Sequence, residues 1–87
     1  MEAIMSKYDP LRHHLNRLKV KRWRASFDDV ERILGTRLPA SAYKYPAWWA
    51  NEKTPTSHVQ KLAWTPIGWR TEELDLAGKQ VTFAKHR

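Results

Sequence analysis

The sequence predicts a small α+β domain in which helices come first and a β-hairpin comes last. Two segments in the first half carry apolar residues at helical spacing behind helix-starting residues. The end of the chain alternates apolar and polar residues around a Gly-containing turn. The chain has 87 residues, 41% of them hydrophobic, with five Trp, three Tyr and two Phe, which suffices for one small core. We therefore expect a single domain over residues 1–87, with residues 1–8 as a flexible N-terminal segment.

The first predicted helix begins at Asp9 and Pro10. Asp can cap a helix N-terminus with its side chain, and Pro fits the first helical position because no hydrogen bond is lost there. One apolar stripe follows at i, i+4 and i+7, formed by Leu11, Leu15 and Leu18. In residues 19–25, β-branched and aromatic residues stand among cations, which predicts a short exposed strand or extended link.

A second helix is predicted to start at Ser26. The hydroxyl of Ser26 and the acid at Asp29 fit a capping box, and Gly35 can take the left-handed conformation that ends a helix. The apolar face of this helix consists of Phe27, Val30, Ile33 and Leu34.

The middle of the chain predicts a compact aromatic corner. Pro39 and Pro46 leave room for a short helical turn over residues 40–45. Residues 47–51 then place two Trp beside Asn51, whose side chain we expect to tie the following loop to backbone amides. Four rings are too many for one exposed surface, so we expect a structural aromatic core of Trp48, Trp49, Trp64 and Trp69.

A third helix and a hairpin complete the predicted elements. Ser57 and Gln60 repeat the capping-box spacing, so the third helix begins there and ends at Pro66 and Gly68. The hairpin strands are residues 69–76 and 80–85, with a basic tip at residues 77–79.

The order of elements is that of a winged helix-turn-helix domain. In such domains the third helix enters a groove of DNA and the hairpin flanks it as the wing. Small α+β protein adaptors share this order, so the order alone does not decide between the two.

Charge favours nucleic acid. The net charge is +7 and the sequence pI about 10.1, a field that attracts polyanions. No acid interrupts the stretch from Arg12 to Arg24, whose cations we expect on phosphates: Arg12, Arg17, Lys19, Lys21, Arg22 and Arg24. Further expected contacts, around the third helix and at the hairpin tip, are Lys53, Thr54, Thr56, Ser57, His58, Gln60, Lys61 and Lys79.

Within that set, Gln60 has the side chain that pairs bidentately with adenine. Three acids of the first hairpin strand oppose this interpretation: Glu72, Glu73 and Asp75. They must point away from the duplex or face a protein partner.

Several motifs together resemble a family of small bacterial domains of uncharacterised function. They are Tyr8-Asp9-Pro10-Leu11, residues 26–31 with Gly35, Leu38-Pro39, Trp48-Trp49-Ala50-Asn51, Ala63-Trp64 with Gly68-Trp69, and Val81-Thr82-Phe83. The resemblance covers almost the whole chain, and this sequence departs from it at Thr65-Pro66. It implies a DNA-related role and no catalytic residues.

Other function classes find little support in the sequence. The absence of Cys removes disulfides, thiolate catalysis and Cys-based zinc sites. His13 and His14 point about 100° apart on a helix, and no P-loop or dinucleotide motif is present. We expect a non-catalytic protein with no cofactor, metal, small-molecule substrate or membrane contact. No apolar h-region of a secretory signal is present, so we expect a cytoplasmic, nucleoid-associated location.

The sequence thus favours a small sequence-specific protein for double-stranded DNA, a bacterial or phage transcriptional regulator that could act as a homodimer. One alternative is a protein-interaction adaptor or inhibitor module. Another is a single-stranded nucleic-acid binder in which Trp23, Tyr43 or Tyr45 stacks on bases.

Overall fold

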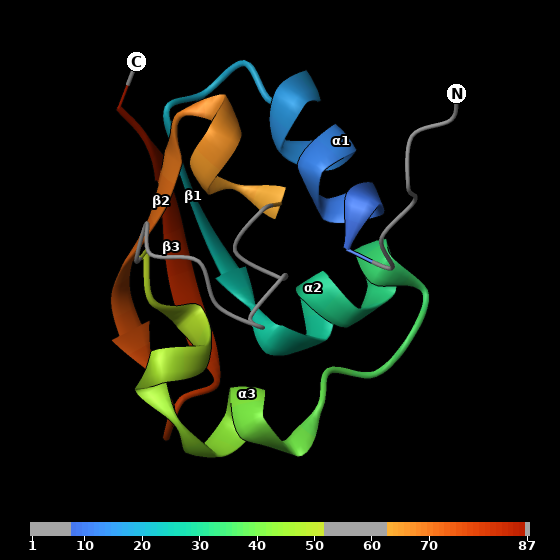
Figure 1. The fold of residues 1–87 in the computed structure, drawn as a ribbon, viewed down its shortest axis with the longest axis vertical. Coiled ribbons are helices and arrows are strands. Elements are labelled where there is room, and N and C mark those ends of the chain that lie inside the picture. Colours follow the sequence, from blue (N-terminus) through green and yellow to red (C-terminus); the bar gives the residue numbers. More distant parts are fainter. Residues whose placement is uncertain (1–7, 52–62, 87) are drawn as a thin grey trace.

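The computed structural model describes residues 8–51 and 63–86 (Figure 1). Their elements are α1 (Asp9–Arg17), β1 (Arg22–Ser26), α2 (Phe27–Leu34), α3 (Ala40–Lys44), the short 3-10 helices η1 (Pro46–Trp49) and η3 (Thr65–Ile67), β2 (Trp69–Asp75) and β3 (Gln80–Lys85). Helices α1 and α2 lie beside a three-stranded antiparallel sheet. The predicted α+β class is confirmed, and the predicted strands lie within two or three residues of the observed ones.

The sheet has the order β1-β3-β2, so the last strand of the chain is the central one. Successive side chains of a strand point to opposite faces. One face is apolar and buried against the helices, and it includes Trp69, Ala25, Val81 and Phe83. The other face carries charge. In β2 the register shifts between Glu72 and Asp75, and Glu73 has a positive φ of 49°, which marks a β-bulge.

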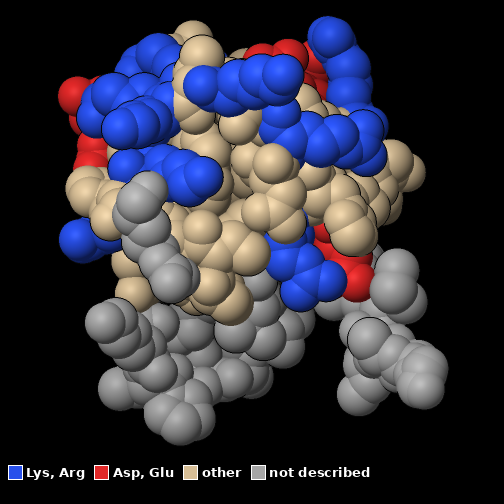
Figure 2. Space-filling model, turned by 90° about the horizontal axis from the view of Figure 1, so that it is seen from above, with Lys and Arg blue, Asp and Glu red and all other residues tan. Residues whose placement is uncertain are grey.

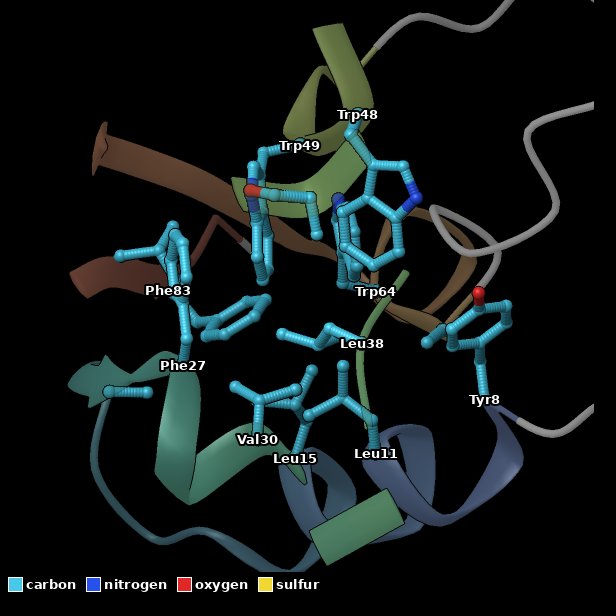
Figure 3. Close-up of a cluster of buried hydrophobic side chains, with 14 of the residues drawn as sticks. Tyr8, Leu11, Leu15, Phe27, Val30, Leu38, Trp48, Trp49, Trp64 and Phe83 are labelled. Carbon is cyan, nitrogen blue, oxygen red and sulfur yellow. The ribbon is translucent and has the colours of Figure 1, made fainter. Parts of the chain in front are cut away.

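The core is aromatic and joins every layer of the domain (Figure 3). The indole ring of Trp49 lies stacked against Phe27 at 4.8 Å and against Trp64 at 6.2 Å between ring centroids. Its Nε1 donates to the carbonyl of Ala42 at 2.8 Å. The predicted aromatic core is confirmed, because Trp48, Trp49, Trp64 and Trp69 are all buried.

The start of α1 differs from the prediction. Tyr8, not Asp9, is the N-cap residue, and no side chain caps the helix. Tyr8 is buried and packs edge-on against Trp48 at 5.9 Å, so it belongs to the core and not to a flexible segment. Asp9 is the first helical residue, and its carboxylate lies 3.3 Å from Arg12. Burial of the Tyr8 ring decides where the helix begins.

The second helix matches its predicted signals. Ser26 Oγ accepts from the amide of Asp29 at 2.9 Å, and the Asp29 carboxylate accepts from the Ser26 amide at 3.2 Å. Gly35 ends α2 with φ of 73°. Most of the predicted third helix lies outside the described residues. Pro66, expected to end it, lies within η3, which stops at Gly68 with φ of 86°.

The hairpin tip packs against the rest of the domain. Gln80, the first residue of β3, pairs with Ser26, the last residue of β1. The carbonyl of Lys79 at the tip accepts from the amide of Phe27 at 2.8 Å. The backbone of the tip therefore packs on the start of α2, while the Lys79 side chain is exposed and its contact with DNA stays a prediction.

Candidate nucleic-acid interface

One end of the molecule gathers cations from three separate segments. The link from α1 to β1, the start of β2 and the end of β3 meet there, since the amide of Lys85 donates to the carbonyl of Lys21 at 2.8 Å and Arg70 pairs with Ala84. Five exposed side chains form this surface, which we call the basic end: Arg17, Lys19, Lys21, Arg70 and Lys85.

The cations of the basic end differ from the other arginines of the predicted set in their acidic neighbours. Within residues 8–51 and 63–86, no ion pair involves any of these five side chains. Figure 2 shows the molecule from this side, with Lys and Arg side chains spread over it and acids toward its edges. Such a surface presents positive charge to a polyanion without first breaking an internal contact.

Two of the arginines expected on phosphate have acidic neighbours instead. Arg22 lies 2.8 Å from Glu72 and 3.0 Å from Glu73 across the charged face of the sheet. Arg24 donates to Gln80 at 2.7 Å and lies 4.0 Å from Glu73. The bulge in β2 brings Glu73 beside Glu72, so both acids lie next to the arginines. Phosphate contact by Arg22 and Arg24 stays a prediction and would have to compete with these pairs.

Glu72 is held in its charged form. The hydrogen bond from His86 at 2.9 Å, followed by that from Arg22, keeps the pKa of Glu72 below its ordinary value. The carboxylate therefore offsets positive charge near the basic end. A polyanion approaching this end is favoured along the side of the α1–β1 link and away from Glu72.

The hairpin tip lies at the opposite end of the sheet. The ammonium of Lys79 is 5.9 Å from the centre of the Tyr43 ring, and the hydroxyl of Tyr43 donates to Glu31 at 2.6 Å. Burial, and then the bond to Glu31, raises the pKa of Tyr43 to about 12. The pKa of Glu31 is lowered by the Tyr43 hydroxyl and next by the amide of Leu38. Lys79 and Tyr43 are thus engaged within the domain.

The rings expected to stack on single-stranded bases differ in exposure. Trp23 is half-buried, with the Phe83 ring stacked at 5.7 Å and the His14 ring at 4.7 Å. Tyr45 is 58% exposed and is the most accessible aromatic side chain among the described residues. Among the described residues, Tyr45 is therefore the ring best placed to stack on a base.

The predicted recognition residues fall largely outside the described part of the chain. These are Lys53, Thr54, Thr56, Ser57, His58, Gln60 and Lys61. Their contacts with DNA stay predictions from the sequence. Of the other cations in the predicted set, Arg12 bonds to Asp9.

Asn51 has a role that the sequence did not indicate. Its Oδ1 accepts from the Thr71 amide at 2.9 Å and from Trp64 Nε1 at 3.0 Å, and its Nδ2 donates to the Thr71 carbonyl at 3.0 Å. The partners are 13 and 20 residues away along the chain. The bond expected from Asn51 to the loop that follows it concerns residues 52–62, which lie outside the described residues. The side chain of Asn51 thus bonds to both the amide and the carbonyl of Thr71, as a residue of a paired strand would, and it joins the end of η1 to β2.

Comparison with known proteins places the chain in one family. A family model described as a domain of unknown function (DUF7662) matches residues 8–87. The chain belongs to this family. The DUF7662 match confirms the resemblance to small domains of uncharacterised function. The search of curated proteins and the search of solved structures find no match.

The described residues hold neither a metal-binding cluster nor a membrane-spanning helix. No group of three or more His, Cys, Asp or Glu is placed to hold a metal ion there. None of the described helices is long and apolar enough to cross a membrane.

The sequence analysis did not single out Arg70 and Lys85. These residues are 15 positions apart along the chain, and strand pairing brings them to the same end of the molecule.

Proposed function

We propose that this protein is a small DNA-binding protein, a bacterial transcriptional regulator that grips the phosphates of double-stranded DNA with its basic end. The observation that carries the proposal is the convergence at that end of five cations from three segments, none of which forms an ion pair within residues 8–51 and 63–86. A solubilising surface intersperses both signs of charge, whereas this one does not. Cations that replace the counterions of DNA supply most of its non-specific affinity.

The topology supports a winged-helix origin for this activity. A helix, strand, helix order followed by a hairpin whose last strand lies in the middle of the sheet is compatible with that fold. Sequence-specific reading would come from the third helix predicted after Pro55, with Gln60 on a base. The cytoplasmic location at the nucleoid follows from the same proposal.

The test is the affinity for a labelled random-sequence duplex over a range of salt concentrations. Five phosphate contacts predict a log-log salt slope of about −4 to −5. The double variant Lys19→Gln with Lys21→Gln is expected to make the slope less negative by about 2. A matched control is Arg37→Gln with Lys44→Gln, which removes the same charge outside the basic end.

The outcomes separate the interpretations. If the control double variant changes the salt slope as much as the Lys19 and Lys21 double variant does, the protein is attracted to DNA by its net charge alone. Absence of duplex binding at low salt would overturn the proposal and favour an acidic protein partner. Tighter binding to single strand than to duplex would transfer the function to exposed aromatic stacking at Tyr45.

A further inference from the structure

A depression between α1 and α2 carries a second set of basic groups. It is lined by Pro10, His13, His14, Arg17 and Ile33. Its four α1 residues are spaced i, i+3, i+4 and i+7, so they share one face of the helix. Helix α1 therefore buries its Leu stripe in the core and presents two imidazoles and a guanidinium along a neighbouring face.

Among the described residues, no acidic side chain lines this depression. The acids of the two helices that form it each have a partner of their own. Asp9 bonds to Arg12, Asp28 to Arg32, Asp29 to the amide of Ser26, and Glu31 to Tyr43. From β1, the Trp23 ring contacts His14 at 4.7 Å. Among the described residues, the groups that face the two imidazoles thus include a cation and an aromatic ring.

We propose that this depression binds a phosphate group, with His13, His14 and Arg17 as its donors. Ring N–H groups and a guanidinium are the donors that recognise phosphate oxygens. Contact with Trp23 restricts the ring of His14 and leaves less rotamer freedom to be lost on binding. Arg17 belongs to the basic end as well, so the depression extends that surface along α1.

Building on the proposed function, we assign the bound phosphate to the backbone of the DNA. This gives the interface a property that Lys and Arg alone do not have. An imidazole gains its charge as the pH falls through the physiological range, whereas Lys and Arg remain charged. Duplex affinity therefore rises as the pH is lowered from about 8 to about 6.

The first experiment measures duplex affinity by fluorescence anisotropy at about pH 6 and about pH 8, at constant ionic strength. For the parent protein we expect a gain of about tenfold at the lower pH. His13→Gln is expected to remove most of that gain and to weaken binding more at the lower pH than at the higher one. Arg17→Gln is expected to weaken binding at both pH values and to make the salt slope less negative by about 1.

The matched control is Lys44→Gln on α3, away from the depression. It is expected to change the affinity equally at both pH values and to leave the pH gain intact. His13 and Arg17 are exposed, so their replacement leaves the core packing unchanged. A parent protein with no pH gain, or a His13→Gln protein that keeps it, would overturn the assignment of the DNA phosphate to this depression.

The second experiment titrates inorganic phosphate and follows the imidazole signals by NMR, with chloride at matched ionic strength as control. Shifts at His13 and His14 that saturate with phosphate alone are expected. If these shifts occur in a protein that binds no duplex, the proposed function is overturned and the depression is a binding site for free phosphate. Duplex binding without these shifts and without the pH gain would keep the proposed function and overturn the phosphate site.

Discussion

At the scale of single residues, the placement of the acids decides which cations are available. The chain carries 16 Lys and Arg against nine Asp and Glu, and the acids are distributed unevenly over the surface. Glu72 and Glu73 engage Arg22 and Arg24 on the charged face of the sheet. Within residues 8–51 and 63–86, the five cations of the basic end have no acidic partner and lie together, which gives the molecule a polarity that its net charge does not reveal.

Tyr43 makes the stability of the domain sensitive to alkaline pH. Its pKa is raised from 10.0 to about 12, so the unfolded chain loses this proton before the folded domain does. The free energy of unfolding therefore falls as the pH rises from about 10 to about 12. Tyr43→Phe is expected to show a shallower fall across that interval, measured from urea unfolding at a series of pH values.

The control for this prediction is Tyr45→Phe, which removes the hydroxyl of an exposed Tyr. It is expected to follow the parent protein over the whole alkaline range. The bond to Tyr43 also lowers the pKa of Glu31, a contribution to stability that is lost as the pH falls below the ordinary value of 4.5. If Tyr43→Phe and the parent protein lose stability in parallel at both extremes, the coupling of Tyr43 with Glu31 has no effect on folding.

At the scale of elements, Asn51 holds three parts of the domain together. Its amide bonds both to the backbone of β2 and to the indole of Trp64. Thr71 Oγ1 in turn donates to the carbonyl of Trp49 at the end of η1. A residue after two Trp thus links the aromatic corner to the sheet through partners 13 and 20 residues away.

Replacing Asn51 with Ala leaves the Thr71 amide, the Thr71 carbonyl and the Trp64 indole without this partner. Partly buried polar groups left unpaired cost about 1 to 3 kcal/mol, so we expect the free energy of unfolding to fall by that amount. Chemical denaturation measures it. The control is Asn16→Ala on the exposed face of α1, the other Asn of the chain, for which no loss is expected. Equal stability of Asn51→Ala and Asn16→Ala would contradict the role of Asn51 as a link.

At the scale of the whole molecule, the domain is organised around one ring. Trp49 contacts Phe27, Trp48, Trp64 and Phe83, which come from four different parts of the chain. A domain of this size has few alternative sources of stability, because it buries a smaller fraction of its surface than a larger domain. The aromatic cluster is therefore the main apolar contribution to its folding.

Trp49→Ala is expected to destabilise the domain by about 3 to 5 kcal/mol, because it opens a cavity at the centre of the cluster. A fold that is only about 5 to 15 kcal/mol stable could be lost altogether, so Trp49→Phe provides a smaller cavity and a measurable midpoint in urea. Retained stability together with lost duplex binding would place Trp49 at the interface instead of the core.

The sequence by itself determined α1, α2 and the three strands, because helix caps, apolar spacing and turn residues are local signals. Ser26 with Asp29, Gly35 and the hairpin strands lie where these signals predict them. The aromatic core also followed from the sequence, since so many large apolar rings must be removed from water.

Only the tertiary structure decided which charges meet. The strand order brings Arg70 and Lys85 to the α1–β1 link and sets Glu72 beside Arg22. Burial of the Tyr8 ring likewise overrode the capping tendency of Asp9. The physical reason is that Coulomb interactions and burial depend on distances in space, which strand pairing sets between residues far apart in the chain.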